Sequence, residues 1–105
     1  MNTTHILFEK HLNELHLKWE AEYRFHGQRK WRFDYVVRLT NGEPLAIEID
    51  GGIYSQGRHT RGTGYQKDLD KLNQATVMGY RVLRFSTTDV LRGRARAFLK
   101  EHLCK

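Results

Sequence analysis

The sequence predicts an α/β fold in which helices flank a mixed β-sheet. Segments with the period-two pattern of strands alternate with segments at helical spacing, and an expected helix separates the last two expected strands, as parallel strands require. The 105 residues are 39% hydrophobic and 11% aromatic. This composition is too apolar for a disordered chain, and the chain is too short for two hydrophobic cores. We therefore expect one compact domain over residues 1–105.

The first half of the chain is expected to form a helix and three strands. Apolar residues recur at helical spacing between Ile6 and Leu15, and Thr3 and Thr4 can cap this segment, which predicts a helix over residues 4–17. Alternating apolar and polar side chains then predict strands. Asn41-Gly42 is a hairpin signal between the second and third of them. The expected strands are residues 20–25, 31–38 and 45–50, with a donor-rich turn at 26–30.

The second half begins with a glycine-rich basic loop over residues 51–64 and continues with a helix, a strand and a helix. Apolar spacing predicts a helix over 65–78, with Gly79 as its C-terminal cap. A strand over 81–85 follows, and Ser86 to Asp89 offers N-caps for one final helix that ends near Leu103. The helix before the last strand predicts a right-handed crossover between parallel strands. The expected order is therefore α-β-β-β-α-β-α.

Charge indicates the class of partner. The chain carries 18 Lys and Arg against 12 Asp and Glu, a net charge of +6. The excess is uneven, because residues 1–50 hold 7 basic and 8 acidic residues whereas residues 51–105 hold 11 and 4. A small basic domain with this asymmetry is a candidate for nucleic-acid binding.

Cysteine content and hydropathy indicate the compartment. The single cysteine, Cys104, excludes an internal disulfide and a cysteine metal site. The first residues lack the pattern of a secretory signal, and the apolar runs are far shorter than a membrane span. We expect a cytoplasmic location and no membrane partner.

Three carboxylates stand within expected strands. Glu48 and Asp50 share one face of their strand, and Asp34 reaches that face if the hairpin pairs its strand with theirs. Like charges crowded together need a compensating cation, and Mg²⁺ or Mn²⁺ is the cation that carboxylate and carbonyl oxygens suit. The alternative is that these acids form ion pairs with Arg32, Arg38 or Arg84.

These residues resemble the PD-(D/E)xK nuclease superfamily, and the resemblance covers roughly residues 5–100. Asp34 is followed, after 13 residues, by Glu48-Ile49-Asp50, and the order of elements matches the superfamily's restriction-endonuclease-like αβββαβα core. The sequence looks closer still to small phage endonucleases and to domains related to very-short-patch repair endonucleases. The segments that carry this closer likeness are Gly51-Gly52, Gly57-Arg58-His59 and Gly79-Tyr80-Arg81-Val82-Leu83-Arg84-Phe85.

The resemblance implies that Asp34 and Glu48 hold the metal. Glu9, on the first helix, is similar to the glutamate that joins the metal site in archaeal Holliday-junction resolvases, so Glu9 or Asp50 is expected to add a ligand. Asp50 stands where the superfamily usually has its catalytic lysine. If Asp50 is not a ligand of this metal, it is expected to orient a water or a lysine, or to bind a second metal.

The missing lysine has candidate replacements. In the superfamily it can come from the following helix, where Lys67 and Lys71 lie one turn apart on one face. His59, on the basic loop, is a further candidate proton carrier or a phosphate contact. The residues expected to contact the nucleic-acid backbone are Arg29, Lys30, Arg58, His59, Arg61, Arg92, Arg94 and Arg96.

The sequence therefore predicts a metal-dependent DNA endonuclease, a hydrolase of phosphodiester bonds. It is either a nicking or repair-type enzyme or a resolvase of branched DNA, and the resolvase would act as a homodimer because it cuts two strands symmetrically. The alternative is a non-catalytic nucleic-acid-binding module on a degenerate nuclease scaffold. The acidic cluster favours the enzyme, since carboxylates facing a phosphate chain weaken plain binding.

Overall fold

The computed structural model describes residues 2–51 and 63–104. The helices are α1 (Thr3–Glu14), α3 (Thr63–Val77), α4 (Thr87–Leu91) and α5 (Arg94–Leu103). The strands are β1 (Lys18–Arg24), β2 (Arg32–Arg38), β3 (Pro44–Asp50) and β4 (Arg81–Ser86). They form one sheet in the order β1-β2-β3-β4, in which β1–β2 and β2–β3 are antiparallel and β3–β4 is parallel. The predicted fold class, a mixed sheet flanked by helices, is confirmed.

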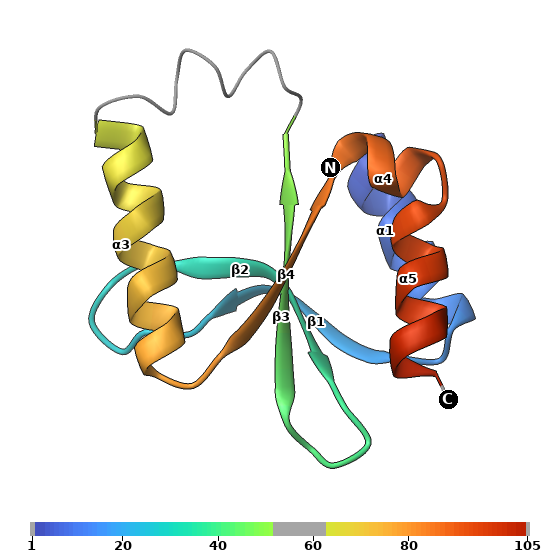
Figure 1. Cartoon of the computed structure of the whole chain (residues 1–105), viewed down its shortest axis with the longest axis horizontal. Helices are drawn as coiled ribbons and strands as arrows, with labels where there is room; N and C mark the ends of the chain where they lie inside the picture. Colours follow the sequence, from blue (N-terminus) through green and yellow to red (C-terminus); the bar gives the residue numbers. More distant parts are fainter. Residues whose placement is uncertain (1, 52–62, 105) are drawn as a thin grey trace.

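The sheet separates two helical layers (Figure 1), with α3 on one face and α1, α4 and α5 on the other. Each face has its own apolar cluster. The cluster on the face of α1, α4 and α5 contains the fully buried Phe8, Leu12, Ile47 and Leu99, together with buried residues of β2, β4, α4 and α5. The α3 face has a smaller cluster around Phe33, Val36 and Ala46 in the sheet and Ala75 in the helix, with Phe25 at its margin.

The ends of several elements depart from the sequence prediction. The expected final helix is two helices, because Gly93 adopts φ 79°, a left-handed conformation, between α4 and α5. Ser86 caps α4 in a capping box with Asp89, as the sequence indicates. At α1 the cap is Asn2 in place of Thr3 or Thr4, with its side chain accepting a bond from the His5 amide at 2.9 Å.

The alternation of β2 breaks at Asp34. The sequence pattern places Phe33, Tyr35 and Val37 on one face, but Tyr35 and Val37 pack under α1 and α5 whereas Phe33 packs under α3. Opposite this point in β1, Glu22 adopts φ 53° between the residues that pair with Phe33 and Tyr35. The break leaves Asp34 at the boundary between the two faces of the sheet.

The glycine-rich loop that the sequence predicts falls mostly on residues 52–62, outside the described residues. Among the helices of the described part of the chain, none has the length and apolar character needed to cross a membrane.

Candidate active site

The site begins where strands β2 and β3 stop pairing. Their last paired residues in this direction are Tyr35 and Ile47. Beyond them, side chains replace the backbone ladder. The Asp34 amide donates to Glu48 Oε2 at 3.0 Å, and the Ile49 amide donates to Asp34 Oδ2 at 2.7 Å. These reciprocal bonds to carboxylates are of the strong, charge-assisted kind, and they hold both acids in fixed positions beside each other.

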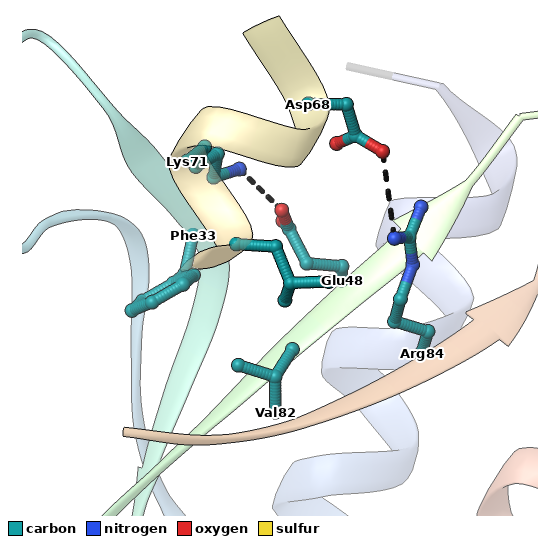
Figure 2. A pocket seen from close by; sticks show the side chains of 7 residues that line it. Phe33, Glu48, Asp68, Lys71, Val82 and Arg84 are labelled. Carbon is teal, nitrogen blue, oxygen red and sulfur yellow. Dashed lines mark hydrogen bonds and ion pairs between the residues drawn. The ribbon is translucent and has the colours of Figure 1, made fainter. Parts of the chain in front are cut away.

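Glu48 is largely buried and has a cationic partner. Its side chain is only 15% exposed, and it forms an ion pair with the ammonium of Lys71 on α3. Burial raises the pKa of Glu48 above its ordinary value, while Lys71 and the Asp34 amide act in the opposite direction. Figure 2 shows the lysine and the glutamate pointing toward each other, and Lys71 Nζ also lies 5.6 Å from the centroid of the Phe33 ring.

Asp50 belongs to a second ion-pair group. Arg84 on β4 donates to both of its carboxylate oxygens, from Nε at 3.2 Å and from Nη2 at 2.9 Å. The same guanidinium reaches Asp68 of α3, with 3.5 Å between Nη1 and Oδ2. The bond to Asp50 is the chief cause of a raised Arg84 pKa. The alternative that the acids pair with arginines thus describes Asp50, and its partner is Arg84.

An open pocket of about 330 Å³ joins these groups. Its lining includes Asp34, Glu48, Ile49 and Asp50 from the strands, with Lys71 from α3. Asp34 and Glu48 offer the hard oxygen donors that Mg²⁺ and Mn²⁺ prefer, and a carboxylate oxygen that accepts one hydrogen bond retains a second lone pair. The donor set therefore fits a divalent cation at these two residues. Asp50, which lines the same pocket, is held by the guanidinium of Arg84.

The expected ligands, which are Asp34 and Glu48 with either Glu9 or Asp50, do not form one cluster in the described part of the chain. Across residues 2–51 and 63–104, no group of three or more histidine, cysteine, aspartate or glutamate side chains is arranged to hold a metal ion. Glu9 lines a second pocket, of about 260 Å³, which Asp34 also lines. There Glu9 accepts a hydrogen bond from the Tyr35 hydroxyl at 2.7 Å. Asp34, at the break in β2, lies between the pocket of Glu48 and the pocket of Glu9.

The structure distinguishes the two candidate lysines. Lys71 is half-buried against Glu48, whereas Lys67 is exposed and is not among the described residues that line the 330 Å³ pocket. The third candidate, His59, lies outside the described residues, as do Arg58 and Arg61.

The remaining cations expected to bind nucleic acid have different surroundings. Arg29 and Lys30 are exposed between β1 and β2, where the Arg29 guanidinium lies 4.9 Å from the centroid of the Trp31 ring. Arg94 pairs with Asp89 at 3.0 Å and Arg96 with Glu14 at 3.3 Å. Arg92 is exposed at the end of α4.

Sequence reasoning named Arg84 as one of three possible partners of the acids, and it missed the part that Asp68 has in the site. One signal for Asp68 was available, since it lies three residues before Lys71, on the same helical face.

The fold is similar to that of a solved structure, the catalytic domain of the homing endonuclease I-Bth0305I. The TM-score is 0.66 at 20% sequence identity, over 96% of this chain and 93% of that chain. No protein-family model matches this sequence, and no curated protein matches it. The arrangement of helices and strands is thus similar to that of this catalytic domain over almost the whole of both chains.

Proposed function

We propose that the chain is a divalent-metal-dependent DNA endonuclease of the PD-(D/E)xK type. One observation carries the proposal. Where β2 and β3 stop pairing, the carboxylates of Asp34 and Glu48 are held side by side by hydrogen bonds from backbone amides, beside a lysine in an open pocket. The similarity of the fold to a homing endonuclease catalytic domain supports the same reaction class. DNA is the proposed substrate, and Mg²⁺ or Mn²⁺ the proposed cofactor.

Asp34 and Glu48 are the proposed metal ligands. A divalent cation held there would lower the pKa of a bound water and stabilise negative charge on the scissile phosphate. The protein's own contribution is orientation, because the Ile49 amide holds Asp34 and the Asp34 amide holds Glu48 before any ligand arrives. Asp50, bound by Arg84 through both oxygens, is assigned no ligand role.

Lys71 is the proposed replacement for the lysine that the superfamily usually has at the position of Asp50. Its ammonium lies on Glu48 and lines the pocket, where it would contact a phosphate oxygen or the attacking water. Replacing Lys71 with alanine should therefore lower the cleavage rate, whereas the same change at the exposed Lys67 should leave it within about twofold of wild type. Equal loss in both variants would contradict the assignment, and loss in neither would transfer the role to His59 or to the metal alone.

The turn between β1 and β2 is the proposed DNA-binding surface on the described part of the chain. Arg29 and Lys30 are exposed there, and Arg24 and Arg32 flank them in the strands. Trp31 follows directly and packs against the cluster that contains Phe33, a residue beside Lys71. A phosphate chain bound at the turn would therefore continue toward the pocket. Each lost phosphate contact should weaken binding and reduce its salt dependence.

The decisive experiment is cleavage of a panel of substrates. Supercoiled plasmid, linear duplex, single strand, flap and four-way junction are each incubated with Mg²⁺, with Mn²⁺ and with EDTA. The wild type should cut only with metal, and Asp34→Asn should not cut. Preference for the junction, with a dimer in solution, would indicate a resolvase; nicking of duplex or plasmid by a monomer would indicate a repair-type enzyme.

One observation favours the alternative of a non-catalytic binding module: in this structure the acids at 48 and 50 both have cationic partners. The same panel separates the two functions. Salt-sensitive binding to DNA without cleavage in either metal would establish the binding module and contradict the nuclease.

A further inference from the structure

Helix α3 contacts the sheet in one way near its C-terminal end and in another way beside the pocket. Of the α3 residues whose burial is described (64–77), only Ala75 is buried, and it lies near the C-terminal end. Helices α1 and α5, by contrast, each bury two residues, Phe8 with Leu12 and Ala95 with Leu99. Apolar burial therefore fixes the far end of α3 and contributes little where the helix passes the pocket.

Two ion pairs join the helix to the strands beside the pocket. Lys71 binds Glu48 of β3, and Asp68 binds Arg84 of β4. Asp68 and Lys71 are three residues apart, so they share one face of the helix. Figure 2 shows both side chains extending from α3 toward the strands, each to its own partner.

Arg84 is well placed to hold the helix because it is itself held. In the parallel register it lies opposite Glu48, and two of its donors bind the carboxylate of Asp50 at 2.9 and 3.2 Å. A planar guanidinium can bind one carboxylate with two donors and still present a third donor to another acid, which a lysine cannot do. Arg84 thus connects β3, β4 and α3.

From this arrangement we propose that Arg84 is a positioning residue: through Asp68 it docks the pocket end of α3, and so keeps the Lys71 ammonium on Glu48. Arg84 acts on the site through Lys71, and its effect on cleavage rests on the proposed function. The docking itself does not, because it concerns the free protein alone.

The test uses the chemical reactivity of two lysines on the same helix. Acetylation by an excess of a succinimidyl ester, followed by mass spectrometry, gives a rate for each lysine. The side chain of Lys71 is 19% exposed and paired, so it should react slowly, and the exposed Lys67 is the internal reference. The labelling is carried out on the full chain without DNA or metal.

Asp68→Asn is the informative variant, and Asp70→Asn is its matched control. Both remove one negative charge from α3, but Asp70 accepts a bond from Gln66 of the same helix and has no such bond to Arg84. The acetylation rate of Lys71 relative to Lys67 should rise about two- to fivefold in Asp68→Asn, the factor that corresponds to a partly exposed ion pair. It should stay at the wild-type value in Asp70→Asn.

Arg84 is tested by graded replacement. Arg84→Gln should raise the relative reactivity of Lys71 at least as much as Asp68→Asn does, and Arg84→Lys should restore only part of the protection. If Arg84→Gln does not fold, Asp68→Asn alone decides, since it leaves the Arg84–Asp50 pair intact. Unchanged Lys71 reactivity in Asp68→Asn, or an equal rise in both aspartate variants, would overturn the proposal.

The cleavage assay adds a second readout. Asp68→Asn should lower kcat by a factor similar to the gain in Lys71 reactivity and leave KM unchanged, because the DNA-binding turn is not altered. A wild-type protein that cuts no substrate would contradict the proposed function, while the labelling result would still decide whether Arg84 docks the helix.

Discussion

The two faces of the sheet are built on different principles. Under α1, α4 and α5, side chains from every one of these elements are completely buried in one apolar cluster. Under α3, an apolar cluster occupies one end and a group of charged side chains occupies the other. The first face contributes the larger apolar cluster, and the second carries the ion-paired groups of the candidate site.

The charged end of the α3 face is possible because the strands part there. Once the β2–β3 ladder ends at Tyr35 and Ile47, backbone amides become available, and the carboxylates of Asp34 and Glu48 accept from them. Burial of acids is costly without such partners. The difference between the faces teaches that the site depends on the end of a strand pairing, and that the core behind it can remain purely apolar.

The largest effect is expected where the α3 face is altered at Glu48. Glu48→Gln should lower the cleavage rate at least about 100-fold, since loss of even an outer partner of a metal ligand costs up to that factor. The free energy of unfolding should change little by comparison, because the substitution also removes the cost of burying the Glu48 charge. Glu43→Gln, on an exposed residue of the β2–β3 turn, is the control for both assays.

Activity of Glu48→Gln near the wild-type level would show that the pocket is not the catalytic site. The two measurements are the initial rate on the preferred substrate and a urea denaturation curve. Loss of both activity and stability would instead mean that the two faces are not as independent as their contacts indicate.

On the apolar face, a substitution is expected to lower stability and to leave the cleavage rate unchanged. Leu99 of α5 is fully buried, and Leu99→Ala should reduce the free energy of unfolding by about 2–5 kcal/mol. The cleavage rate per folded molecule should be unchanged. Leu91→Ala, at a side chain that is 53% exposed, should cost far less and provides the comparison in the same urea denaturation experiment. A lower cleavage rate per folded molecule of Leu99→Ala would contradict the division of the faces.

The sequence predicted the elements of both faces more fully than it predicted the site. Periodicity and turn signals located the helices and strands because those patterns are local, and the capping box at Ser86 was visible for the same reason. The split of the last helix at Gly93 was missed, since an apolar stripe continues on both sides of that glycine.

The site depends on long-range placement, and there the sequence was less informative. Period two correctly placed Glu48 and Asp50 on one face, but the break at Asp34 depends on the backbone of β1, which no pattern in β2 reveals. The pairing of Asp50 with Arg84 requires the parallel register of β3 and β4. Between Lys67 and Lys71 the sequence offered no choice, because their spacing places both on one helical face.

A smaller effect is expected from the cap of α4, which belongs to the apolar face. Ser86 Oγ accepts from the Asp89 amide at 3.0 Å, and Ser86→Ala removes that bond. The free energy of unfolding should fall by about 0.5–2 kcal/mol, the usual range for loss of an N-cap. Thr88→Ala, at an exposed residue within α4, should cost less. A urea denaturation series would contradict this prediction if the two variants were equally stable.

The smallest effect is a dependence on pH that comes from Asp89, the other member of the same cap. Bonds from the Ser86 amide at 3.0 Å and from Arg94 hold the Asp89 pKa below its ordinary value of 3.8. Because the folded-state pKa is the lower one, this stabilisation is fully present above pH 3.8 and is lost as the pH falls through the folded-state value. The free energy of unfolding of the wild type should therefore decline more steeply below pH 3.8 than that of Asp89→Asn.

Urea denaturation at a series of pH values measures this difference, with Asp70→Asn as the control for loss of one carboxylate. The wild-type and Asp89→Asn curves should converge toward low pH and separate to a constant difference at neutral pH. Parallel curves would mean that the cap does not depend on the charge of Asp89. Because Asp89 is not among the described residues that line the pocket, the cleavage rate of Asp89→Asn at neutral pH should equal that of the wild type. Equal rates would show that a charged group can stabilise the apolar face without acting on the chemistry of the other.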